Sequence, residues 1–159
     1  MKNLEAYGIS KANKRNYESI LYMLALIHNS LEKKFGDYFA ACGTSMPKYN
    51  ILMAVAYVNG GAGLNQKEIG EHLIASPSNV TKLVESLNRD GLISRVQNKS
   101  SRRENVIKIT AKGQKFIDKH WDEYDKMASG AVGIFSGVEQ KKLIELLGKW
   151  FVSLEDSKA

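Results

Sequence analysis

Two clusters in the middle of the chain hold the side chains best suited to binding chemistry: a short polar run at 76–82 and a basic segment at 95–108. The basic segment contains a single acid, Glu104, and five basic residues: Arg95, Lys99, Arg102, Arg103 and Lys108. A local concentration of positive charge suits a polyanion better than an evenly charged surface does. We therefore expect this segment to contact nucleic acid phosphates.

The polar run lies at the start of the segment SPSNVTKLVESLNRDGL, residues 76–92, which predicts an amphipathic helix. Its apolar residues recur at three and four positions and should pack inward: Val80, Leu83, Val84 and Leu87. Short polar side chains on the opposite face let a helix enter a DNA groove, where Asn79 can pair with adenine and the Thr81 methyl can meet thymine. The predicted DNA contacts of this helix are Ser76, Ser78, Asn79, Thr81 and Lys82.

Residues 93–97 and 104–110 predict two strands of a hairpin around the basic segment. The predicted DNA contacts at its tip are Lys99, Ser100, Ser101, Arg102 and Arg103. Lysines and hydroxyls there suit phosphates, and a guanidinium suits the negative potential of a narrow minor groove. Two short helices joined by a tight turn and followed by such a hairpin predict a winged helix-turn-helix.

Other elements must hold these clusters in place. Periodic apolar residues predict helices at 13–41, 47–57, 65–74, 76–90, 111–129 and 138–154. Asn65 and Glu68 resemble a capping box, and Ser76 and Thr110 are expected N-caps. Gly91 supplies the left-handed residue that ends the fourth helix, and the stretch 130–137 is expected to loosen the chain before the last one.

Residues 64–113 resemble the MarR family of bacterial transcription regulators. The matching motifs are Leu64-Asn65, the run from Leu87 to Arg95, Ser101-Arg102-Arg103, and the closing Ile109 to Gly113. The resemblance makes Arg103 the minor-groove residue. Ser101 stands where the family keeps an aspartate that helps to hold the wing, so the wing is expected to be looser and more positive.

The resemblance implies a mainly α fold with a small β part: a winged helix-turn-helix with a hairpin wing, flanked by N- and C-terminal dimerisation helices. We expect one domain, 1–159, with a DNA-binding part at 46–110 and dimerisation helices at 13–42 and 111–156. The terminal helices hold more apolar surface than a small winged helix can cover. The chain is therefore expected to act as a homodimer, a sequence-specific repressor on a pseudo-palindromic operator in double-stranded DNA.

Relatives in this family bind small aromatic or phenolic ligands, which implies a ligand that releases the DNA. Candidate residues for such a cleft are Tyr17, Met23, His28, Met46, Tyr49 and Trp121. Aromatic and methionine side chains at helical spacing also serve simply as core. Both interpretations stay open at this point.

A single cysteine, Cys42, excludes an intramolecular disulfide and suits a reducing cytoplasm. No Arg or His stands beside it in the sequence, so we expect an incidental cysteine, although some family members sense peroxides through a thiol. His28, His72 and His120 show no zinc-type spacing, and no nucleophile–base or phosphate-loop motif indicates an enzyme. We expect no cofactor, no metal and no membrane segment. A redox-sensing regulator and a winged helix that binds proteins remain the alternatives.

Overall fold

The computed structural model describes Tyr7 and residues 15–73, 75–97 and 105–156 of the 159-residue chain. Its elements follow in the order α1 (Asn16–Ala41), α2 (Met46–Tyr57), a 3-10 turn η2 (Val58–Gly61), α3 (Gln66–Leu73), α4 (Pro77–Arg89), β1 (Ile93–Gln97), β2 (Asn105–Ile109), α5 (Ala111–Val132) and α6 (Gly137–Asp156). The chain is mainly helical with one small antiparallel sheet, as predicted.

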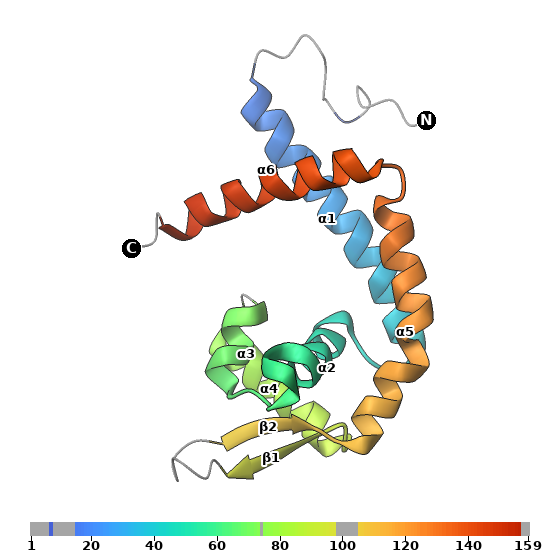
Figure 1. The fold of residues 1–159 in the computed structure, drawn as a ribbon, viewed down its shortest axis with the longest axis vertical. Helices are drawn as coiled ribbons and strands as arrows, with labels where there is room; N and C mark the ends of the chain where they lie inside the picture. Colours follow the sequence, from blue (N-terminus) through green and yellow to red (C-terminus); the bar gives the residue numbers. More distant parts are fainter. Residues whose placement is uncertain (1–6, 8–14, 74, 98–104, 157–159) are drawn as a thin grey trace.

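Figure 1 shows two parts. The short helices α2, α3 and α4 and the hairpin form a compact winged helix. The helices α1 and α5 run side by side away from it, and α6 crosses the N-terminal half of α1. The aromatic rings of Phe35 and Tyr124 join α1 to α5, with centroids 5.9 Å apart. The helix α5 therefore connects the hairpin directly to α1 and α6, and the helices α1, α5 and α6 together form the arm of the molecule.

Local capping chemistry sets where the short helices begin. Asn65 and Glu68 form the predicted capping box before α3: the Asn65 backbone N–H donates to Glu68 Oε2 at 2.7 Å, and the Glu68 N–H donates to Asn65 Oδ1 at 2.9 Å. Thr110 caps α5, since its Oγ1 accepts from the Gly113 N–H at 3.0 Å. Gly91, with φ of +71°, ends α4 in the left-handed conformation that suits glycine.

The strand β2 is hydrogen-bonded along both of its edges, to β1 on one side and to Leu64 on the other. The strands β1 and β2 pair antiparallel, with Ile93 opposite Ile109. On the other side, the Leu64 N–H donates to the Ile107 carbonyl at 3.0 Å and the Ile107 N–H donates to the Leu64 carbonyl at 2.8 Å. The base of the wing thus has a fixed register relative to the chain before α3.

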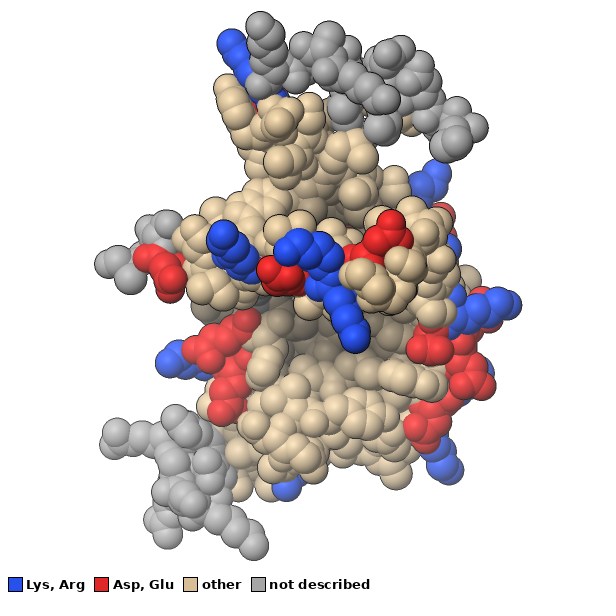
Figure 2. All heavy atoms as spheres, turned by 45° about the horizontal axis from the view of Figure 1, so that its top comes forward, with Lys and Arg blue, Asp and Glu red and all other residues tan. Residues whose placement is uncertain are grey.

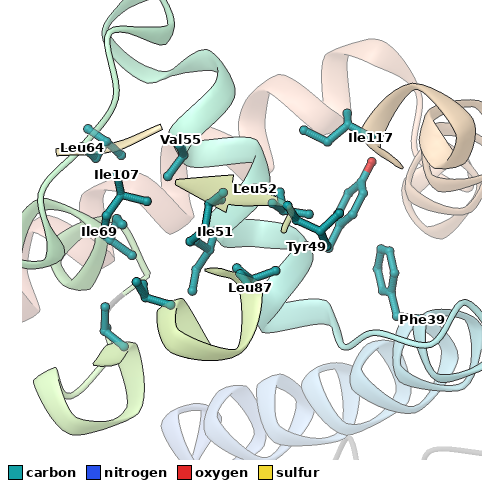
Figure 3. Close-up of a cluster of buried hydrophobic side chains, with 14 of the residues drawn as sticks. Phe39, Tyr49, Ile51, Leu52, Val55, Leu64, Ile69, Leu87, Ile107 and Ile117 are labelled. Atoms are coloured by element: carbon teal, nitrogen blue, oxygen red, sulfur yellow. The ribbon is translucent and has the colours of Figure 1, made fainter. Parts of the chain in front are cut away.

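One hydrophobic core lies beneath these elements (Figure 3). Its buried residues come from α1, α2, α3, α4, the hairpin and α5, and include Phe39, Ile51, Leu52, Ile69, Val80, Leu87, Ile107 and Ile117. Tyr49 of α2 packs between α1 and α5, with its ring 4.6 Å from that of Phe39 and 5.2 Å from that of Tyr124. The winged helix and the start of the arm therefore share one packed interior.

The last two helices differ in one respect from the prediction. Gly130 was expected to begin a loose stretch, but α5 continues through it to Val132, and the turn to α6 occupies 133–136. A single helical glycine costs only about 1 kcal/mol relative to alanine. The helix α5 therefore continues through Gly130 despite that cost.

Candidate nucleic-acid interface

The helix α4 has the two faces that the sequence predicts. Val80, Val84 and Leu87 are completely buried, and Leu83 is partly buried against the same core. Ser76 is the N-cap and its Oγ accepts from the Asn79 N–H at 3.4 Å, with Pro77 in the first turn. The side chains of Ser76, Ser78, Asn79 and Lys82 are exposed. These four predicted contact residues lie together on the free surface of the helix.

Thr81 belongs to the same surface but is only partly exposed, and its hydroxyl is engaged within the protein. Thr81 Oγ1 donates to the Pro77 carbonyl at 2.9 Å and accepts from Gln66 Nε2 of α3 at 3.2 Å. Sequence reasoning missed Gln66. The sequence feature that points to Gln66 is its position directly after the cap Asn65, at the start of the helix that precedes α4.

The hairpin places its described residues beside α4. Arg95 on β1 and Lys108 on β2 are exposed, so two of the five basic residues lie on the free surface of the wing base. The predicted tip contacts Lys99, Ser100, Ser101, Arg102 and Arg103 lie outside the described residues. Their roles in DNA binding stay predictions.

Polar contacts join the end of α4 to the start of α5. Lys112 Nζ donates to the Asp90 carbonyl at 2.7 Å, and Thr110 Oγ1 donates to the Gly91 carbonyl at 2.8 Å. Lys48 of α2 lies 3.5 Å from the Asp90 carboxylate. These contacts tie the C-terminal end of the candidate recognition helix to α5.

The six candidate cleft residues do not lie at one place. Tyr49 is completely buried, Met46 packs against the core beside it, and Trp121 lies near Tyr124, with ring centroids 6.1 Å apart. The other three lie on α1. Tyr17 is 61% exposed, His28 lies 3.9 Å from Glu32, and Met23 lines a hollow of about 300 Å³ with Leu147 and Trp150 of α6. The structure thus offers an aromatic cluster and an apolar α1–α6 hollow, and the ligand prediction remains untested.

Tyr49 carries a buried hydroxyl with no hydrogen-bond partner among the described residues, and Figure 3 shows this hydroxyl on the side of Ile117. Burial, and then the nearby Tyr124, raises the pKa of Tyr49 to about 12. A buried unpaired hydroxyl costs about 1–3 kcal/mol. We therefore expect Tyr49→Phe to raise the free energy of unfolding by about 1 kcal/mol in urea titrations.

The contrasting variant is Tyr49→Ala, which removes the whole ring and should cost about 3–5 kcal/mol. A clear loss of stability in Tyr49→Phe would show instead that the hydroxyl makes a favourable contact in solution. That result would support a polar ligand or bound water at this tyrosine.

Cys42 has a histidine beside it in the fold, although none lies near it in the sequence. His120 Nδ1 of α5 lies 3.5 Å from Cys42 Sγ, and the Tyr38 hydroxyl lies 3.0 Å from the same nitrogen. Burial, and then the Lys119 ammonium, lowers the pKa of His120. The imidazole is therefore mostly neutral at pH 7, and an unprotonated Nδ1 can accept one proton, either from the Cys42 thiol or from the Tyr38 hydroxyl. The expectation of an incidental cysteine rests on sequence neighbours alone, and it stays a prediction beside this spatial contact.

This contact predicts the reactivity of the thiol. At pH 7, His120→Asn should slow alkylation of Cys42 by iodoacetamide on the order of tenfold, because the base that assists the thiol is gone. The difference should vanish as the pH falls below the pKa of His120, where the imidazole is protonated. Mass spectrometry follows the single adduct. The exposed His72, changed to Asn, is the matched control, and equal rates for all three proteins would refute the assistance.

Among the described residues, no helix is long and apolar enough to cross a membrane. No group of three or more His, Cys, Asp or Glu side chains in that part of the chain is placed to hold a metal ion.

Comparisons with known proteins agree with this geometry. Residues 45–105 match the sequence model of the MarR family. The HTH-type transcriptional regulator BilQ of Clostridium symbiosum is 26% identical over 117 residues, covering 71% of this chain and 81% of BilQ. The HTH-type transcriptional repressor YetL of Bacillus subtilis is 26% identical over 117 residues, covering 74% of this chain and 70% of YetL. The crystal structure of the S. aureus MepR–DNA complex has the same fold, with a TM-score of 0.75 and 23% identity over 83% of this chain and 96% of MepR.

Proposed function

The chain belongs to the MarR family of DNA-binding transcriptional regulators, and from that premise we propose that it acts as a homodimeric repressor on a pseudo-palindromic operator and is released by a small aromatic effector. The observation that carries the proposal is the surface of α4. Val80, Val84 and Leu87 are completely buried on its inner face, while Ser78, Asn79 and Lys82 are exposed on a helix whose position in a winged helix suits the major groove.

Dimerisation is supported by apolar side chains that the single chain leaves exposed. On α1 they include Tyr17, Ile20, Leu21, Leu24 and Ile27, and on α6 they include Ile144, Leu147, Phe151 and Leu154. All residues of α6 are described, and none of them is buried. In Figure 2, charged side chains gather in a band across the middle and at the sides, while broad areas between them carry no charge. A two-fold contact between copies of these helices would cover the apolar side chains.

Repression and effector release are the finer parts of the proposal. The relative YetL is named a repressor, and a dimer that occupies a promoter site can block transcription by occupancy alone. The hollow between α1 and α6 and the aromatic cluster around Tyr124 are the places suited to an aromatic effector. A ligand at either place would contact the arm that sets the distance between the two winged helices.

The experiment is a salt titration of binding to DNA selected from a random library. The affinity of the wild-type protein should fall steeply as salt rises, because phosphate contacts release counterions. Arg103→Ala should weaken binding to every sequence and reduce the slope of log Kd against log salt by about 1. Asn79→Ala should cost about 1–3 kcal/mol at one base pair and relax the sequence preference there.

Lys126→Ala is the matched control, because it removes an exposed charge from α5 well beyond the hairpin. It should leave both the slope and the preference unchanged. Binding that does not change with salt concentration, or that changes in neither Arg103→Ala nor Asn79→Ala, would refute the assignment of the DNA-binding surface.

A further inference from the structure

Thr81 has almost no hydrogen-bonding capacity left for DNA. A hydroxyl offers one proton and two lone pairs. The proton of Thr81 goes to the Pro77 carbonyl at 2.9 Å, and one lone pair accepts from Gln66 Nε2 at 3.2 Å. What remains is one lone pair and the methyl group. In this state Thr81 cannot donate a hydrogen bond to a base or a phosphate.

The two partners of the hydroxyl belong to different helices. Pro77 lies one turn earlier on α4, and Gln66 is the first residue of α3. A hydroxyl held from both sides keeps its side chain in one rotamer, since rotation about χ1 would break both hydrogen bonds. The contact with Gln66 therefore also fixes where the Thr81 methyl points.

The surroundings make this contact a specific link between the two helices. Deeper in the pair, α3 and α4 approach closely, since a Cβ on Gly70 would lie 3.6 Å from Val80 Cγ2. Toward the surface they diverge around a hollow of about 490 Å³, lined by Gln66, Lys67, Gly70, Glu71, Ala75, Pro77 and Thr81. Gln66 reaches Thr81 at the edge of this hollow. Gln66 is exposed on α3, and Thr81 is partly exposed on α4 next to the exposed Lys82 in sequence.

We propose that Gln66 is a positioning residue for base recognition: by occupying the Thr81 hydroxyl it presents the Thr81 methyl group, and not the hydroxyl, to a base pair. Apolar contact with a methyl favours the C5-methyl of thymine in the major groove. This inference rests on the proposed function, because it concerns the same DNA-binding surface. Gln66 acts through Thr81 and reads no base itself.

The test uses the full chain, the DNA selected by the wild-type protein, and versions of that DNA with single base-pair changes. Thr81→Val keeps a methyl in place of the hydroxyl and should retain the preference for thymine at one position. Thr81→Ser keeps the hydroxyl but loses the methyl, and should reduce that preference roughly fivefold, as expected for one buried methyl. Gln66→Met keeps the length of the side chain, removes the donor, and should lower the preference two- to fivefold.

A double-mutant cycle separates positioning from direct contact. If Gln66 acts through the Thr81 hydroxyl, Gln66→Met should change nothing further in a Thr81→Val background, and the salt slope should stay that of the wild type. Equal effects of Gln66→Met in both backgrounds would mean that Gln66 contacts DNA itself, and would overturn the inference. So would retention of the thymine preference by Thr81→Ser.

Failure of the proposed function has a different signature. In that case the wild-type protein selects no sequence from the library, and both conclusions fall together. If the wild type does select a sequence and only the Gln66 and Thr81 variants behave otherwise than stated, the regulator assignment stands and the positioning role is refuted.

Discussion

Gly113→Ala is expected to destabilise the protein by about 3 kcal/mol, a large core effect for the addition of a single methyl group. A Cβ at this position would lie 2.0 Å from the Leu92 carbonyl oxygen and 2.7 Å from Ile109 Cδ1. The Leu92 carbonyl is backbone and cannot rotate away, and it accepts from the backbone N–H of Thr110 at 3.1 Å. The methyl group would therefore force α5 away from the hairpin.

Urea unfolding followed by circular dichroism measures this loss. Gly130→Ala is the matched control, since it lies in the same helix with nothing within 4 Å of its Cβ position. It should stabilise the protein by about 0.5–1 kcal/mol, because alanine favours the helix. If Gly113→Ala proved as stable as the wild type, α5 would not pack on Leu92 in solution as described.

Leu147→Asp is expected to convert the proposed homodimer into monomers and to weaken DNA binding by at least about 100-fold, since two linked half-sites gain that much from avidity. Leu147 is 44% exposed in the single chain and lines the hollow between α1 and α6. Two-fold symmetry would place two new carboxylates in one apolar interface, where unpaired charge is strongly unfavourable. Sedimentation gives the oligomeric state, and fluorescence anisotropy gives the affinity.

The winged helix itself should survive this substitution, because α6 contributes no buried residue to the core. Lys149→Asp places the same carboxylate two residues along α6, on the opposite face, and should leave the dimer intact. A wild-type protein that sediments as a monomer at micromolar concentration would contradict the homodimer. A Leu147→Asp protein that remains dimeric would instead place the interface elsewhere.

Local sequence chemistry determines much of this fold, and that part was predictable. The caps at Asn65, Ser76 and Thr110 depend on side chains that bond within three residues, so short motifs reveal them. The apolar spacing of Val80, Val84 and Leu87 likewise predicted which face of α4 is buried. The outward position of Ser78, Asn79 and Lys82 follows from the same periodicity.

The features that were not predicted depend on contacts between residues that are far apart in the sequence. Cys42 and His120 are 78 residues apart, and only the packing of α1 on α5 brings them together. The contact between Gln66 and Thr81 joins side chains 15 residues apart, and the motif predicts the pair of helices but not this side-chain contact. The six cleft candidates are aromatic or methionine residues that lie at different places in the structure. Side chains at helical spacing on different helices need not converge, and the ligand prediction stays a prediction.

The paired backbone of Leu64 and Ile107 has a consequence for how such a regulator can diversify. Since hydrogen bonds on both edges of β2 hold the base of the wing, we expect substitutions or insertions between Gln97 and Asn105 to leave this register unchanged. We expect the sequence NKSSRRE at 98–104, which includes Ser101, to tolerate exchange while this register is kept. We therefore expect descendants of this chain to vary the charge of this segment, and with it the overall strength of phosphate binding, without a change of fold.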